Sequence, residues 1–152
     1  MIKKRIFALI LALLCLCGCG HTQSPSAYDL SFAKVLMDTG AFEGSEMAQV
    51  DLELAAILYG IDPTTIEDGV FYMAVNTSVS ADELLLLVLK NEAAAEKAYE
   101  ACKARVESQI KVCKSYTPAA VPRLEAARLG KLGNTVLLAV GDPDLINSVG
   151  VQ

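Results

Sequence analysis

The chain has 152 residues, 53% of them hydrophobic, with 13 Lys and Arg against 18 Asp and Glu. This length fits one domain with a moderate core. Three of the basic residues precede position 18 and all the acidic residues follow it, so the remainder, with 10 basic and 18 acidic residues, carries a net charge of −8. Anionic lipids and phosphate backbones repel such a surface, which argues against lipid-surface docking and against nucleic acid as a partner.

The amino-terminal segment has the anatomy of a secretory signal peptide. Lys3, Lys4 and Arg5 form a short positive region, and an unbroken apolar run follows from residue 6 to residue 14. Even when counted to residue 18, the apolar stretch is only about 13 residues, whereas a transmembrane helix needs about 20. We therefore expect residues 1–18 to be a cleaved signal peptide rather than a membrane span.

Leu16, Cys17, Gly18 and Cys19 stand where this signal peptide would be cut. A bacterial lipoprotein needs a cysteine sulfur to receive a diacylglyceryl group, a small residue just before it, and a branched aliphatic residue three positions before it. Cys19, Gly18 and Leu16 fill these roles, whereas Cys15 and Cys17 each follow a leucine. We expect Cys19 to be the lipidation site, because a diacyl thioether supplies the two chains that stable anchoring needs.

Two further cysteines, Cys102 and Cys113, lie within one predicted helix. At 1.5 Å per residue their Cα atoms would be about 16 Å apart, well beyond the limit of about 7 Å for a disulfide. Their spacing is close to three helical turns, so both thiols share a face with Ala95 and Val106. We interpret them as core residues rather than as a redox or metal site.

The segment after the anchor begins with a polar tether, residues 19–27, which has no periodicity. Two helical patterns follow it. The first helix is expected over residues 26–40, with a capping-box pattern at its start and a glycine at its end. The second is expected over residues 47–61, and Pro63 then begins a tight turn or a short turn of helix.

Two short apolar runs follow, and the second is ambiguous. Val70 to Val75 is aromatic and partly β-branched, which predicts a strand. Leu84 to Leu89 is continuously apolar, which suits a buried central strand, although leucine also favours helix. We expect a strand over residues 83–90. The alternative is one long helix from residue 81 to residue 115.

The clearest element is a helix over residues 92–116, rich in Ala, Glu and Lys, with a buried stripe opposite a charged face. A rigid connection containing two prolines, residues 117–122, ends it. The remaining elements are expected in this order: strands at residues 124–132 and 135–140 around a turn at Gly133-Asn134, and a short helix from residue 142 to residue 149.

These elements predict an α+β fold, with residues 28–152 forming a single domain. Two amino-terminal helices come first and are followed by ββαββ. The four strands form a mainly antiparallel sheet, and the long helix is packed on one face of it.

Several short motifs resemble those of a known family. They are Tyr59-Gly60-Ile61-Asp62 before the first strand, Ala81-Asp82-Glu83 before the apolar run, Arg105 with Gln109 in the long helix, Tyr116-x-Pro118 after it, and Gly133-Asn134 in the last hairpin. In this order, roughly residues 28 to 142 resemble a family of small, uncharacterised lipoproteins of Gram-positive bacteria, a domain of unknown function. Members often have an aromatic residue after Gly-Asn, where this chain has Thr135. The family has no assigned activity, so the resemblance implies no catalytic residue.

Signatures of catalysis are mostly absent from the sequence. The single histidine, His21, lies in the tether, where a general base could not be held in position. The sequence has no Gly-x-Ser-x-Gly elbow, no phosphate loop and no Cys/His set with metal spacing. Asp142-x-Asp144 lacks the glycine and the distal glutamate of a calcium loop. We therefore expect no cofactor, no metal site and no catalytic residue.

The candidate binding residues are Arg105, Gln109 and Tyr116. Arg105 and Gln109 are four residues apart, so they lie side by side at the edge of the buried stripe. A guanidinium there is a natural fork for a carboxylate, which would come from a ligand or, in the simpler interpretation, from the domain itself. Tyr116 and Pro118 look like the packed exit of the helix, although an exposed Tyr-Pro edge would suit recognition.

These observations favour a lipoprotein on the extracytoplasmic face of the cell membrane, acting as a non-enzymatic binding or accessory module of the cell envelope. The expected partners are the membrane, through the diacylglyceryl anchor, and an envelope protein. The alternative is an envelope hydrolase or transferase that uses carboxylates, which would require a cleft containing Glu67, Asp68 or Asp82. A structural spacer without a partner is a third hypothesis.

Replacing Cys19 with Ser should block both lipidation and processing, because only this sulfur can receive the diacylglyceryl group with Gly18 at the cut site. The precursor would keep an apolar run that is short for a span, and it would bind membrane weakly or be degraded, while the domain still folds. Mass spectrometry of wild-type protein from a membrane fraction is the direct check. A mature amino terminus elsewhere, or an unmodified Cys19, would overturn the prediction.

Overall fold

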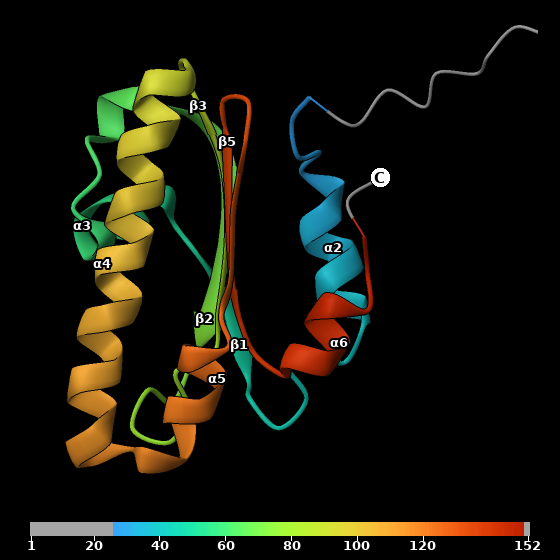
Figure 1. Cartoon of the computed structure of the whole chain (residues 1–152), viewed down its shortest axis with the longest axis vertical. Coiled ribbons are helices and arrows are strands. Elements are labelled where there is room, and N and C mark those ends of the chain that lie inside the picture. Colours follow the sequence, from blue (N-terminus) through green and yellow to red (C-terminus); the bar gives the residue numbers. More distant parts are fainter. Residues whose placement is uncertain (1–25, 151–152) are drawn as a thin grey trace, which may run out of the picture.

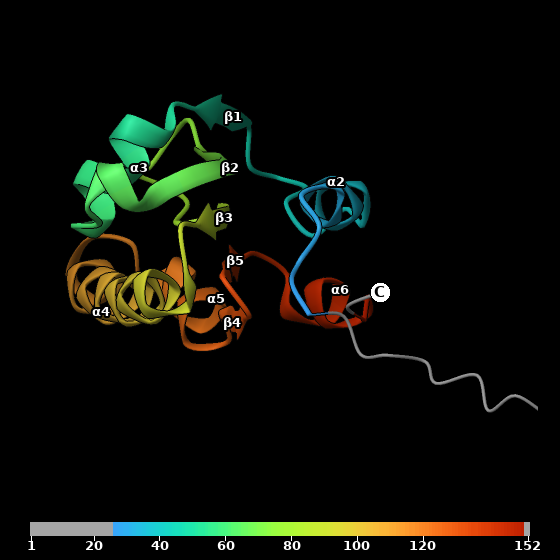
Figure 2. The same ribbon diagram turned by 90° about the horizontal axis from the view of Figure 1, so that it is seen from above.

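The computed structural model describes residues 26–150. The predicted signal peptide and the lipidation site at Cys19 lie outside the described residues. The described part has an α+β fold in which one sheet carries helices on both faces (Figures 1 and 2). Among its helices, none combines the length and the apolar character that crossing a membrane requires.

The sheet has five strands, all antiparallel to their neighbours, in the order β1-β2-β3-β5-β4. The strands are β1 (Met47–Val50), β2 (Ile66–Ala74), β3 (Glu83–Leu89), β4 (Arg128–Leu132) and β5 (Thr135–Val140). The prediction of a strand at residues 83–90 is confirmed. Because β3 is central and covered on both faces, it has no side that faces solvent, and its sequence from Leu84 to Leu89 is therefore continuously apolar.

The expectation of four strands and two leading helices is corrected at residues 47–61. Met47–Val50 is a strand rather than the start of a helix, and it pairs with the second half of β2, from Phe71 to Ala74. Only then does α3 (Leu52–Tyr59) begin, and it ends at Gly60, whose φ of 68° suits glycine. Four residues are too few to reveal a strand period, so the hydrogen bonds offered by β2 decide the conformation.

Two other boundaries also differ from expectation. Helix α2 (Ser31–Asp38) begins at Ser31 rather than Ser26 and has no side-chain cap. Residues 118–125 are not a rigid connection leading into a strand, because they form a short 3-10 turn, η3 (Pro118–Ala120), and helix α5 (Val121–Glu125). Pro118 and Pro122 both sit in first turns, where no backbone N–H is needed, so prolines start these helices instead of preventing them.

The remaining elements have the expected character. Helix α4 (Glu92–Tyr116) has the predicted bounds, and the Asn91 side chain caps it by accepting the Ala94 N–H at 2.9 Å. The turn begun at Pro63 is the 3-10 helix η2 (Pro63–Thr65). The last helix, α6 (Pro143–Asn147), begins after an Asp142 cap.

Two apolar layers enclose the sheet. Helices α3, α4 and α5 cover one face, and α2 and α6 cover the other (Figure 2). Alternate residues of β3 serve the two layers, with Leu85 and Leu87 facing α4 and Leu84 and Leu86 facing α2 and α6. Cys102 and Cys113 are buried and unbridged in the α4 layer, as the sequence predicted.

The described chain enters the fold beside the turn between β4 and β5. The backbone N–H of Tyr28 donates to Thr135 Oγ1 at 2.9 Å. A side chain on Gly130 would meet the Tyr28 hydroxyl, and one on Gly133 would meet the Ser26 carbonyl oxygen. These glycines therefore let the entering segment lie directly against the hairpin, at the end of the sheet opposite the carboxyl end of α4 (Figure 1).

Candidate functional site

Two adjacent acids mark the beginning of the central strand. Asp82 and Glu83 are 1% and 4% exposed, although burying an unpaired carboxylate is very unfavourable. Asp82 lies just before β3 and Glu83 is its first residue, and the two side chains meet different partners. Each carboxylate binds an arginine from a different helix.

Glu83 is bound on the α4 side of the sheet. Arg105 donates to it through Nε, at 3.0 Å from Oε2, and through Nη2 to Oε1, which makes a bidentate pair. The Tyr59 hydroxyl, from the last residue of α3, donates to Oε2 at 2.7 Å. The guanidinium also lies over the Tyr59 ring, 4.8 Å from its centroid. Glu83 thereby joins the central strand to α3 and α4.

This environment fixes the protonation of both partners. Burial, reinforced by the charge of Glu83, raises the pKa of Tyr59 well above its usual range, so the phenol is neutral. Burial acts to lower the pKa of Arg105, but the hydrogen bonds and charge of Glu83 outweigh it and raise that pKa. Arg105 therefore remains a cation, and among residues 26–150 its Nη1 makes a single contact, at 3.5 Å from the Leu58 carbonyl oxygen.

Asp82 is bound by residues from two other segments and by Ser80, two positions before it in the chain. Arg123 Nη1 of α5 donates to Oδ2 at 2.6 Å, and Ser45 Oγ donates to the same oxygen at 2.7 Å. Ser80 Oγ accepts the backbone N–H of Asp82 at 3.1 Å and lies 2.9 Å from Ser45 Oγ. Asp82 thus ties α5 and the loop before β1 to the start of β3.

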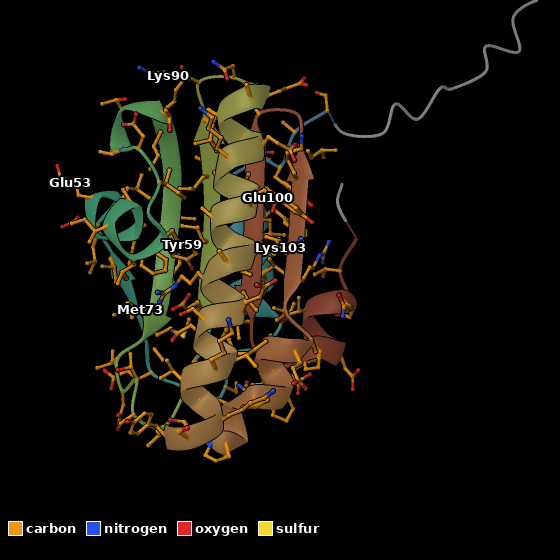
Figure 3. All side chains as sticks on the ribbon, turned by 60° about the vertical axis from the view of Figure 1, so that its left-hand side comes forward. Glu53, Tyr59, Met73, Lys90, Glu100 and Lys103 are labelled. Carbon is orange, nitrogen blue, oxygen red and sulfur yellow. The ribbon has the colours of Figure 1, made fainter. Side chains whose placement is uncertain are left out.

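A groove of about 580 Å³ opens between the second half of α4 and the β2–β3 connection. Its apolar wall includes Leu58, Met73 and Val112, and Asp82, Glu83 and Arg105 line it as well. In Figure 3, Tyr59 and Met73 lie on the side where α3, β2 and α4 meet. A second hollow of about 360 Å³, lined by Ser45, Asp82 and Arg123, lies on the other side of Asp82.

The three candidate binding residues, Arg105, Gln109 and Tyr116, all line the larger groove beside α4. Arg105 uses its bidentate edge for an acid of its own domain, which is the simpler of the two interpretations drawn from the sequence. Tyr116 is 82% exposed at the rim, so it is not a packed helix exit. Gln109 is half-buried, and its amide makes no hydrogen bond to another residue in the described part of the chain.

Sequence reasoning missed the partners of the two acids, namely Tyr59, Arg123 and Ser45. The available signal was an Asp-Glu pair at the start of a run otherwise suited to a buried strand, because acids there need counter-ions. Which arginine serves which acid depends on how α4 and α5 pack on the sheet, and periodicity carries no such information.

The acids proposed for a catalytic cleft are not brought together. Asp68 pairs with Val88 at one end of β2, whereas Met73 pairs with Glu83 at the other, so Glu67 and Asp68 lie far from Asp82. Both are exposed. Within residues 26–150, no cluster of three His, Cys, Asp or Glu side chains could hold a metal ion.

A protein-family model described as Domain of unknown function (DUF4358) matches residues 41–141. The chain belongs to the DUF4358 family. The match runs from the loop before β1 to the end of β5, so it includes both arginine–carboxylate pairs and the groove of this DUF4358 domain. No curated protein and no solved structure matches the chain.

Replacing Arg105 with Met should lower the free energy of unfolding of the DUF4358 domain by about 3–5 kcal/mol, because Glu83 then stays buried without its counter-ion. Adding Glu83→Gln should restore most of this loss, since no charge remains and Tyr59 keeps an acceptor. Urea denaturation followed by circular dichroism measures both variants. A double variant as unstable as Arg105→Met alone would contradict this account.

Burial raises the pKa of the Cys102 thiol to about 12, and the nearby charge of Glu83 adds to this effect. Folding therefore favours the protonated thiol, and this contribution to stability is lost as the pH rises from about 8.5, the ordinary thiol value, towards about 12. The stability advantage of the wild type over Cys102→Ala should shrink across this range. Denaturation of both proteins in a pH series tests it, and an unchanged difference would refute it.

Proposed function

We propose that this chain is a lipid-anchored, extracytoplasmic lipoprotein that works as a non-enzymatic binding module of the cell envelope. The signal-peptide pattern with Cys19 supports the anchor. The groove beside α4 carries the binding role, because it combines an apolar wall, an exposed aromatic rim at Tyr116 and the unpaired amide of Gln109. Ligand sites have this combination of apolar lining and a few placed polar groups.

The chemistry of the groove favours binding over catalysis. Both of its carboxylates are engaged by arginines, and the neighbouring phenol of Tyr59 is held neutral. The Cys102 thiol is fully buried and does not line the groove, and with its pKa raised to about 12 it is a poor nucleophile. The phenol and the thiol are therefore not poised to exchange a proton near neutral pH, as a general acid or base must be, and both carboxylates are already occupied by ion pairs.

Crosslinking from intact cells, with the anchored protein as bait, tests the binding role. Val112→Glu places a charge on the groove wall, at a position already 49% exposed, and should abolish capture of a specific partner without unfolding the domain. Lys111→Glu adds a carboxylate to the adjacent exposed position outside the groove and should leave capture unchanged. Equal capture by the wild type and both variants would refute a binding role for the groove.

The second hollow supports the competing class, a carboxylate-based envelope hydrolase or transferase. There Ser45 Oγ lies 2.7 Å from Asp82 Oδ2, which is the distance at which a nucleophilic hydroxyl donates a hydrogen bond to its general base. Arg123 donates to that same oxygen, so the carboxylate oxygen nearest Ser45 is already held in an ion pair. Turnover of an envelope substrate that is lost in Ser45→Ala would establish this class and overturn the binding proposal.

A further inference from the structure

The groove and the chain entry lie at opposite ends of the sheet. The entering segment is held beside Thr135, and Thr135 pairs with Val88. The groove lies at the other end of β3, where Glu83 pairs with Val140. At about 3.4 Å per residue, the length of β5 separates the two ends by roughly 17 Å. Figure 1 shows this arrangement, with the entering chain near the β4–β5 turn and α4 ending at the far end.

This separation limits where a lipid on Cys19 can be. Residues 19–25 can span at most about 24 Å when fully extended. A tether of that length keeps the entry end of the sheet within about 24 Å of the bilayer, and when the strands stand upright on the membrane the groove end is the outer end. In that orientation the groove opens towards molecules on the outer side of the domain rather than towards the lipid of the membrane.

The charges of the groove argue against an anionic occupant. Two carboxylates and one guanidinium line it, and the guanidinium already binds Glu83. Arg123 pairs with Asp82 from outside the groove, so both acids are neutralised and no excess charge of either sign is left for a phosphate, a free carboxylate or a cation. The groove therefore suits an uncharged ligand.

The open hydrogen-bonding groups match a peptide. The Gln109 amide both donates and accepts, and Arg105 Nη1 has donors that no strong internal bond uses. A backbone amide in an extended segment offers both complements side by side. The apolar wall formed by Leu58, Met73 and Val112 adds a place for one apolar side chain.

We infer that the groove binds an uncharged, extended peptide segment with one apolar side chain, displayed by a protein on the side of the domain that faces away from the bilayer. This inference rests on the proposed lipid anchor and binding role. It adds the chemical class of the ligand and the direction from which the ligand comes.

The test uses the full mature lipoprotein in vesicles of phosphatidylglycerol and phosphatidylethanolamine, with random heptapeptides blocked at both ends as the probe. Benzoylphenylalanine replaces Tyr116 at the groove rim in one sample and Lys90 at the entry end in another; Figure 3 shows Lys90 far from Met73. After illumination, mass spectrometry identifies the adducts. Position 116 should trap uncharged peptides containing Leu, Ile, Val or Phe, and position 90 should trap phospholipid.

A matched pair of variants tests the role of the amide. Gln109→Ala should reduce the peptide adducts at position 116 by roughly tenfold, the effect of losing paired hydrogen bonds. Ser108→Ala, at the exposed neighbouring position outside the groove, should leave them unchanged. Equal effects of the two variants would overturn the role of Gln109.

Three results would overturn the inference: lipid adducts at position 116, a preference there for charged peptides, or no peptide adduct at all. Failure of the anchor has a different signature. In that case the protein does not float with the vesicles and position 90 traps no lipid, whereas position 116 still reports whether the groove selects uncharged peptides.

Discussion

The fold depends on the neutralisation of two acids at the beginning of its central strand. Asp82 and Glu83 are buried, and each needs a counter-ion that the sheet does not supply. Arg123 reaches Asp82 from α5 and Arg105 reaches Glu83 from α4, so the charges position both helices as well as satisfying the acids. Apolar contacts alone would hold α4 on the sheet without fixing its axial position, because they are not directional. The groove exists where the second half of α4, held in this way, stands beside the β2–β3 connection.

The sequence predicted the elements whose signal is local. Helix α4 was predicted from Asn91 as its cap and from an apolar stripe opposite a charged face. The run Leu84–Leu89 was long enough to indicate a buried strand. Strand β1 could not be predicted, because its conformation depends on a partner strand that comes later in the chain. The prediction of a rigid connection at Pro118 and Pro122 was wrong for another reason, because proline suits both an extended connection and the first turn of a helix.

The same distinction applies to the candidate site. Helical spacing placed Arg105 and Gln109 side by side on α4, and the structure places both of them, together with Tyr116, in the lining of the groove. The internal partner of Arg105 lies 22 positions earlier in the chain, and the residue that completes the pair, Tyr59, belongs to a separate helix. Contacts of that kind arise from packing, so a single sequence shows only that buried acids need partners.

The segment that enters beside the β4–β5 hairpin also has a mechanical consequence. Tension between an anchored entry and an object held in the groove would run along the strands, since the two lie at opposite ends of β3 and β5. The hydrogen bonds between antiparallel strands are perpendicular to that direction. They would be loaded together in shear instead of being opened one after another, so the domain is built to transmit a pull from one end to the other without unzipping.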